Sequence, residues 1–288
     1  MLTDTHAHLD FPDFADDLPG VLDRARAAGV HRMVCIGTTV ESSRSAIALA
    51  EKYDDVYAVI GIHPNAAEEA PEDAIEVLRE LAKHPRVVAI GEIGLDYYRL
   101  PGAQLRKQGF RDLGFTGAEM PGEADADALD ACAKGAQALL FEQQLELAVE
   151  LRHNVVIHQR ESWEDTLEIL QRYTGKLRAV YHCFGEGPER AAQLLELGHL
   201  VSFTGIITFK NARLVQETAA GLPAGKFMVE TDCPYLAPVP YRGKKCEPAY
   251  VRETAAFLAE LRKVSLEELA RETEQTANSF FAFNGTPA

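Results

Sequence analysis

Eight short apolar runs, each followed by a helix-like stretch, constrain the fold of this chain more than any other feature. The runs cover residues 2–8, 32–37, 56–62, 87–93, 154–158, 178–183, 200–206 and 226–232. Strands that alternate with helices form parallel sheets, and eight such units are the number that closes a TIM-type (β/α)8 barrel. The competing fold is an open doubly wound sheet, but no Gly-x-Gly-x-x-Gly motif follows the first run. The pattern therefore predicts the α/β barrel.

The composition is consistent with a single barrel domain over residues 1–288. Of the 288 residues, 47% are hydrophobic and 25% are charged, which is enough apolar material for one large core. No run approaches the ~18 apolar residues of a membrane span, and the chain begins in a strand rather than in a signal peptide, so we expect a cytoplasmic protein. The five cysteines include no Cys-x-x-Cys pair, which indicates neither a disulfide framework nor a zinc knuckle.

Candidate metal ligands lie in the first run and at the ends of four others. His6 and His8 stand two positions apart, so their side chains point to the same face of a strand. Alone, this pair is equally consistent with edge-strand histidines that bind nothing. The other four candidates, each at or just beyond the end of an apolar run, are Glu92, His158, His182 and Asp232. Each one singly is typical of a hydrogen-bonded structural residue, but together, at the carboxyl edge of a parallel sheet, they predict a hydrolytic divalent-metal site.

Six short segments, in order along nearly the whole chain, resemble the signatures of the TatD family of metal-dependent hydrolases. They read DTHAHLD (4–10), GIHP (61–64), GEIGLDYY (91–98), VIHQR (156–160), HCF (182–184) and ETDCPYLAP (230–238). The resemblance implies a TIM barrel, a divalent-metal centre and a 3′ to 5′ deoxyribonuclease activity. It also implies two divalent ions, with Mg²⁺, Mn²⁺ and Zn²⁺ all left open.

The resemblance further implies a role for each candidate ligand. In this scheme His6, His8 and Asp232 hold one metal, and His158 and His182 hold the other. Glu92 bridges the two metals, since each oxygen of a carboxylate can face one cation. Related barrels use a carbamylated lysine as the bridge, so a glutamate at this position argues against the lysine-bridged amidohydrolases and phosphotriesterases.

The metal site suggests a mechanism in which a metal-bound hydroxide attacks a phosphodiester. Coordination lowers the pKa of water from 15.7 toward ~7, so the hydroxide is available at neutral pH. We expect Glu92 and Asp232 to be the catalytic residues, with Asp232 accepting or orienting the proton. A role for Asp232 as a ligand alone is equally consistent with the sequence. His63 is a candidate phosphate contact or outer hydrogen-bond donor, although the adjacent Pro64 also fits a purely structural turn.

The net charge of −15 and the pI near 5.1 oppose a nucleic-acid substrate at first sight. The charge at the site differs from that of the whole molecule, however, because two divalent cations would add positive charge there. Basic residues also fall near the strand-end loops: Arg99, Arg160, Arg242, Lys244 and Lys245. We therefore expect DNA or another phosphate ester as substrate, bound by His63, Arg160 and Arg242. An ordinary solvated loop is the competing interpretation of residues 241–248.

One segment departs from the family pattern. Residues 99–138 include a run rich in Gly, Ala and Asp at 117–127, where a short link into the next helix would suffice. Loops longer than ~12–15 residues are usually functional or disordered. Because this insertion leaves the catalytic end of the fourth strand, we expect a mobile flap that contributes little to the fold. Its acidic end would favour single-stranded ends or small phosphate esters over a duplex.

Two other functions remain open at this point. A metal-dependent ester hydrolase, such as an aminoacyl-tRNA deacylase, could use the same six ligands, because nothing in them distinguishes phosphorus from carbonyl carbon. A non-catalytic binding protein is the third possibility. It is disfavoured because a degenerate site would be expected to lose at least one ligand, and none is missing.

Overall fold

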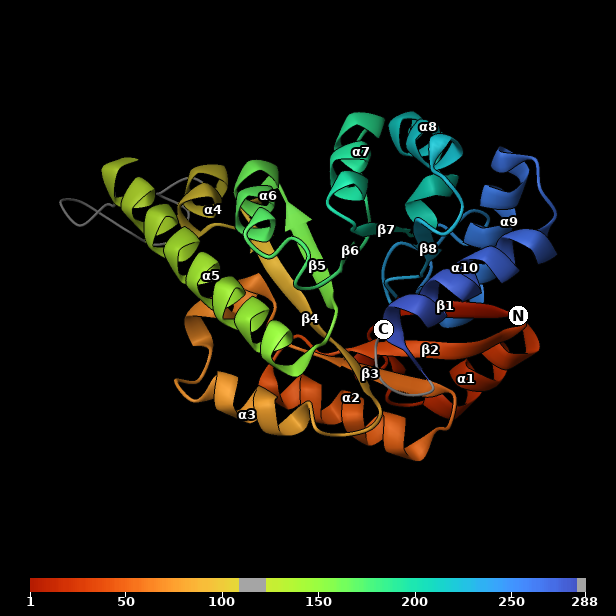
Figure 1. Ribbon diagram of the computed structural model, residues 1–288, viewed down its shortest axis with the longest axis horizontal. Helices are drawn as coiled ribbons and strands as arrows, with labels where there is room; N and C mark the ends of the chain where they lie inside the picture. The colour runs from red at the N-terminus through yellow and green to blue at the C-terminus, as the bar shows by residue number, and fades with distance from the viewer. Residues whose placement is uncertain (109–122, 284–288) are drawn as a thin grey trace.

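The computed structural model describes residues 1–108 and 123–283. Eight strands form one sheet in chain order, and each strand is parallel to the next (Figure 1). They are β1 (Leu2–Ala7), β2 (Val30–Ile36), β3 (Val56–Ile60), β4 (Val87–Asp96), β5 (Val155–Arg160), β6 (Ala179–Tyr181), β7 (Leu200–Phe203) and β8 (Phe227–Val229). A parallel bridge between Ala7 and Cys233 brings the two ends of the sheet together. The predicted (β/α)8 barrel is confirmed as a nearly closed one.

Helices follow the strands and cover the outside of the barrel (Figure 1). They are α1 (Leu18–Ala27), α2 (Val40–Lys52), α3 (Ala74–Leu81), α4 (Pro101–Gln108), α5 (Glu123–Leu151), α6 (Trp163–Gln171), α7 (Pro188–Glu196), α8 (Arg213–Gly221), α9 (Val251–Arg262) and α10 (Leu266–Phe281). Short 3-10 turns are η1 (Pro12–Phe14), η2 (Pro64–Glu69), η4 (Gly205–Thr208) and η5 (Pro248–Tyr250). Within the described ranges, no helix is long and apolar enough to cross a membrane.

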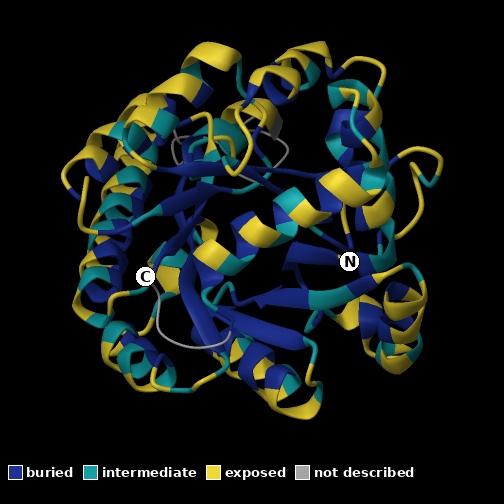
Figure 2. Ribbon diagram, turned by 45° about the vertical axis from the view of Figure 1, so that its right-hand side comes forward, coloured by how far each residue is buried: buried dark blue, intermediate teal, exposed yellow. Residues whose placement is uncertain are grey.

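The alternation of strand residues sorts the core into two clusters. The larger cluster packs strand residues such as Met33 and Cys35 against the surrounding helices. The smaller one takes the alternate side chains, including Val34 and Ile36, and packs them against Phe280 at the end of α10. Because neighbouring strand residues face opposite sides of a sheet, this second cluster is the barrel interior. In Figure 2, α10 runs across the centre of the view toward the C-terminus.

Two strands extend further than the apolar runs predict. β4 continues to Asp96 and β5 to Arg160, so Glu92 and His158 both lie inside their strands rather than at the strand ends. The reason is the close approach of the two strands at Gly94, where a Cβ atom would collide with the carbonyl oxygen of His158. Without that Cβ, the pairing continues through Gly94 with His158 to the end of both strands.

The insertion after β4 is largely helical, and the expectation of a loop that contributes little is wrong for its described part. Its residues 101–108 form α4, and 123–138 belong to the 29-residue helix α5. Alanine, the strongest helix former, recurs through the start of α5 and outweighs the loop-like composition. Ala126, Ala133 and Gln137 are buried in this segment, so it packs against the barrel. Residues 109–122, including most of the Gly-rich run at 117–127, lie outside the described residues.

Candidate metal centre

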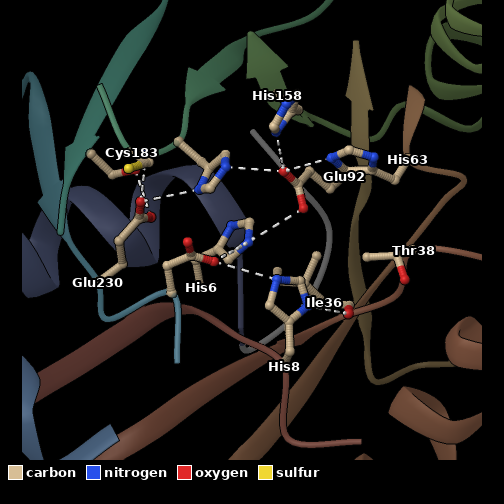
Figure 3. Close-up of polar contacts among 12 residues, drawn as sticks. His6, His8, Ile36, Thr38, His63, Glu92, His158, Cys183 and Glu230 are labelled. Atoms are coloured by element: carbon tan, nitrogen blue, oxygen red, sulfur yellow. Dashed lines mark hydrogen bonds and ion pairs between the residues drawn. The ribbon is translucent and has the colours of Figure 1, made fainter. Parts of the chain in front are cut away.

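The structure brings all six candidate ligands together at the carboxyl end of the barrel (Figure 3). They form two adjoining groups, and within each group one ligand atom per residue lies within 4.8 Å of the others. The first group is His6, His8 and Asp232, and the second is Glu92, His158 and His182. His6 and His182 also form such a group with Glu230, as do His63, Asp96 and His158. The members come from β1, β4, β5 and the segments that follow β1, β6 and β8. Parallel strands deliver residues distant in sequence to one edge, which explains why a barrel can assemble this cluster.

The carboxylate of Glu92 lies between the two groups. Its Oε1 is 2.7 Å from His158 Nδ1 and 2.9 Å from His182 Nε2. Its Oε2 is 3.5 Å from His6 Nε2, in the other group. Burial opposes ionisation of Glu92, but the charge of His182 and the hydrogen bonds with His158 and His182 outweigh it, so the pKa of this carboxyl lies well below its usual range. An ionised carboxylate with one oxygen toward each group can act as a ligand in both groups.

The imidazole rings of the first group are oriented to present ligand atoms. His8 Nδ1 is 3.2 Å from the backbone oxygen of Ile36, an acceptor, so Nδ1 carries the proton and donates it. This leaves the lone pair of His8 Nε2 free, 3.4 Å from Asp232 Oδ1. Both ring nitrogens of His6 are buried and have no hydrogen-bond partner in the part of the chain that the structure describes. A buried unpartnered nitrogen in such a cluster fits a metal ligand.

Two buried carboxylates contact the histidines of the second group at the ring nitrogens that face away from Glu92. Asp96 Oδ2 is 3.2 Å from His158 Nε2, and Glu230 Oε1 is 3.4 Å from His182 Nδ1. Glu230 is fixed in turn by the Cys183 amide and the Ser202 hydroxyl, each 2.6 Å from one of its oxygens. A carboxylate that accepts the outer ring proton directs the other nitrogen of a histidine toward a metal and makes it more basic.

Two further carboxylates of the site, Asp96 and Glu230, are not among the predicted residues, although the sequence carries a signal for both. Asp96 stands four positions after Glu92, and Glu230 two positions before Asp232. Even spacing along an extended segment places side chains on one face, so both carboxylates could have been assigned to the metal face.

Asp232 adopts a left-handed backbone conformation, with φ of +59°, that turns its side chain into the site. Its amide donates to the His6 carbonyl at 2.9 Å, and the preceding Thr231 is bound through its amide and hydroxyl to the buried carboxyl of Asp4. Burial raises the pKa of Asp4 to about 8. Aspartate tolerates the left-handed region better than most residues, and such conformations persist where surrounding contacts hold them.

Protons on the histidines balance the buried carboxylates. Burial opposes the charged form of His182, but Glu92 and Glu230 raise its pKa well above the usual value. The pKa of His6 is lowered, first by burial and then by the charge of His182. Because metal ligands must be deprotonated, a bound cation would replace protons of this kind. The donor set of imidazoles and carboxylates therefore fits divalent metal ions.

Of the three predicted substrate contacts, the structure brings His63 directly to the cluster. Its Nδ1 accepts from the Asn65 amide at 3.0 Å, so the proton sits on Nε2, which lies 3.7 Å from Glu92 Oε1. Burial lowers the pKa of His63 to about 3, so the ring is neutral at pH 7. His63 thus presents an N–H group to the site.

Arg160, the last residue of β5, and Arg242, in the segment after β8, lie further out at the same end of the barrel. The Arg160 guanidinium stacks 3.7 Å above the Tyr98 ring, and that of Arg242 lies 4.3 Å from the centre of the Phe209 ring. Both side chains belong to exposed residues. Neither forms an ion pair with any residue in the ranges 1–108 and 123–283, so both positive charges are available to an anion.

The barrel and the buried His and carboxylate groups at its carboxyl end define a metal-dependent hydrolase. A family model described as TatD related DNase matches residues 3–282. The chain belongs to the TatD family of metal-dependent hydrolases.

The relatives agree with this assignment. An uncharacterized metal-dependent hydrolase of Bacillus subtilis, YabD, is 35% identical over 285 residues, which cover 99% of this chain and all of that protein. YcfH of Escherichia coli, also an uncharacterized metal-dependent hydrolase, is 36% identical and covers 95% of this chain and 92% of its own length. The crystal structure of the Escherichia coli TatD homologue YjjV superposes with a TM-score of 0.81 at 28% identity and covers 98% of each chain.

Proposed function

We propose that this TatD-family hydrolase is a phosphodiesterase that trims DNA from 3′ ends at a site for two divalent metal ions. The observation that carries the proposal is the position of Glu92, whose two oxygens face two separate groups of ligands. His6, His8 and Asp232 would hold one ion, and His158 and His182 the other, with Glu92 shared. Two cations held in this way would supply a nucleophile at neutral pH and would neutralise charge on the phosphate.

The residues around the cluster would bind and orient the phosphodiester. His63 would donate its Nε2 proton to a non-bridging phosphate oxygen, since that N–H already points into the site. Asp232 would orient the attacking water and accept its proton through the carboxylate oxygen that faces His8. Asp96 and Glu230 would keep the rings of His158 and His182 in the required orientation.

The free cations support a phosphate-ester substrate over an aminoacyl ester. Arg160 and Arg242 each present an unpaired guanidinium at the rim of the site, and a planar guanidinium matches the geometry of phosphate oxygens. The Tyr98 ring that carries the Arg160 guanidinium is also contacted by Lys107, whose Nζ lies 3.9 Å from the ring centre. The net charge of −15 on the whole chain repels a long duplex, whereas the local positive charges attract only the part of the substrate at the site. A single-stranded end is therefore favoured over a long duplex.

A substrate screen tests the proposal. Metal-stripped protein is reconstituted with Mg²⁺, Mn²⁺ or Zn²⁺ and offered single-stranded DNA, RNA, small phosphodiesters and aminoacyl esters. We expect stepwise release of nucleotides from the 3′ end of single-stranded DNA, with none from Glu92→Gln under the same conditions. Leu214→Ala, an exposed substitution on α8, is the control and should behave as the wild type. Hydrolysis of aminoacyl esters alone would replace the phosphodiesterase with an ester hydrolase.

A further inference from the structure

Two aromatic side chains beside the metal centre, the half-buried Phe11 and the exposed Tyr235, are not explained by the fold or by the proposed chemistry. The Phe11 ring stacks on His8, with ring centres 4.6 Å apart and planes 19° apart. Tyr235 approaches Phe11 edge-on, with ring centres 6.3 Å apart, and 55% of its surface is exposed. Single exposed apolar residues are common, but neighbouring aromatic rings that form one exposed surface often mark a ligand-binding site.

The same kind of backbone turn positions both rings. Each ring follows a proposed metal ligand by three residues, Phe11 after His8 and Tyr235 after Asp232. In both cases the aromatic residue's amide donates to the carbonyl oxygen of the ligand residue, at 3.2 Å for Phe11 and 3.0 Å for Tyr235. The His8 amide in turn donates to the Cys233 carbonyl at 2.9 Å, which ties the two turns together. The aromatic pair is therefore held in a fixed position relative to the cluster.

The chemistry of the pair matches the flat face of a nucleobase. One face of Phe11 is covered by the His8 ring, and Tyr235 stands across its edge, so together they form a corner open to solvent. The Tyr235 hydroxyl finds no partner among the described residues. Aromatic rings bind every base through its π-face, without reading its hydrogen-bonding edge. A phosphate or an aliphatic ester would gain little from such a surface.

We infer that Phe11 and Tyr235 stack against the unpaired base of the nucleotide next to the cleaved ester. The inference rests on the proposed phosphodiesterase function and adds to it a binding site for the base. In a duplex the faces of a base are already covered by its neighbours, so stacking here requires a single-stranded or frayed end. The site then selects ends that carry a base, with little preference among the four bases.

Fluorescence of a base analogue tests the stacking directly. The probe is a single-stranded oligonucleotide with 2-aminopurine at its 3′ terminus and a phosphorothioate at the last linkage to slow cleavage. Stacking quenches 2-aminopurine, so we expect quenching with the wild type and with Tyr235→Phe, and its loss with Tyr235→Ala. Leu214→Ala removes a comparably exposed apolar side chain from α8 and should quench as the wild type does.

A kinetic comparison provides the second readout. An oligonucleotide with a normal 3′ nucleotide is compared with one that ends in an abasic residue. We expect the wild type to favour the normal end by roughly 5- to 150-fold in kcat/KM, the fold-change that corresponds to stacking one base on an aromatic ring. In Tyr235→Ala this ratio should fall toward one, and Tyr235→Phe should restore it.

The outcomes separate the stacking inference from the proposed function. If the oligonucleotide is bound and cleaved but quenching and end preference are the same in the wild type and Tyr235→Ala, the stacking inference is wrong and the phosphodiesterase stands. If no oligonucleotide is bound or cleaved with any metal, the phosphodiesterase is wrong and the stacking inference falls with it.

Discussion

Asp232 is placed both to bind a metal ion and to act as a base. Its Oδ1 lies 3.4 Å from His8 Nε2 and 3.7 Å from His6 Nε2, so it can contribute to a metal site from the same oxygen that would orient water. Asparagine keeps the shape and one ligating oxygen but removes the basicity.

We predict that Asp232→Asn binds metal more weakly and loses turnover even when the site is full. At saturating metal, kcat should fall roughly 10²–10⁴-fold, the usual contribution of a positioned acid-base group. Metal content must be measured in the same samples, because an empty site would also explain the loss. Turnover within about threefold of the wild type at full occupancy would leave Asp232 as a ligand only.

The close approach of β4 and β5 at Gly94 can be tested by substitution, with Gly135 on α5 as the matched control. Gly94 has a φ of +141°, and an added Cβ would collide with the His158 carbonyl, whereas Gly135 on α5 has open space around it. We predict that Gly94→Ala destabilises the fold by about 1–3 kcal/mol or more and displaces His158. Gly135→Ala should instead stabilise the fold by about 0.5–1 kcal/mol, since alanine is the better helix former.

Urea unfolding and metal affinity of both variants check this prediction. Weakened metal binding in Gly94→Ala but not in Gly135→Ala would connect the strand contact to the cluster. Equal stability of the two variants would contradict the argument from the missing Cβ.

Residue patterns alone predict the six candidate ligands because each stands in or beyond an apolar run. They do not predict how far β4 and β5 extend, since that depends on the glycine contact across the two strands. Asp96 and Glu230 were missed because a single buried carboxylate has many structural roles, and only the assembled barrel places them behind His158 and His182.

At the scale of elements, α5 braces the barrel through two buried glutamines. Gln144 accepts from the Ile62 amide at 2.8 Å and donates to the Ile62 carbonyl at 3.1 Å. Gln137 makes the same pair of bonds with Asp96, at 2.9 Å and 3.2 Å. The two side chains are seven residues apart and therefore share a face of the helix. They hold the chain just before His63 and at the end of β4.

We predict that Gln144→Leu destabilises the protein by about 1–3 kcal/mol for each backbone group of Ile62 left buried and unpaired. The neighbouring Gln143 is exposed, and Gln143→Leu should change stability by no more than about 0.5 kcal/mol. Chemical denaturation of both variants provides the comparison. Similar losses in the two would show that the effect comes from leucine on α5 rather than from the lost hydrogen bonds.

The helical insertion could not be predicted from its composition. Glycine and aspartate are typical of loops, and the alternation of strands and helices has no place for an extra helix before α5. Besides the alanine content of α5, tertiary contacts stabilise these helices: Asp130 of α5 accepts from the backbone of Gly102 at the start of α4, and Gln137 pairs with Asp96. Replacing residues 99–138 by a short linker would remove these contacts, so we expect it to destabilise the fold.

The stability of the whole molecule should depend on pH through His199, which lies away from the metal centre, next to β7. His199 is fully buried and accepts from the Ala179 amide at 3.2 Å, and burial together with Arg178 lowers its pKa to about 4. The unfolded chain binds a proton near the ordinary value of 6.5. The contribution is therefore complete above pH 6.5 and is lost as the pH falls toward 4.

We predict that the wild type loses about 3 kcal/mol over this range relative to His199→Asn, which keeps an acceptor for the amide but cannot titrate. Urea unfolding of both proteins at several pH values between 7 and 4 measures the difference. Curves that stay parallel throughout would mean that His199 is protonated in the folded state or does not contribute.

At the scale of the whole molecule, we propose that two divalent ions shared by Glu92 make this barrel a phosphodiesterase. The most direct test is a metal titration of the stripped protein, with bound metal per chain and nucleotide release from single-stranded DNA measured on the same samples. We predict that release appears as occupancy reaches two ions per chain and that Glu92→Gln, which cannot bridge as a carboxylate, neither fills both sites nor releases nucleotides. Full activity at one ion per chain, or activity that survives chelation, would contradict the account.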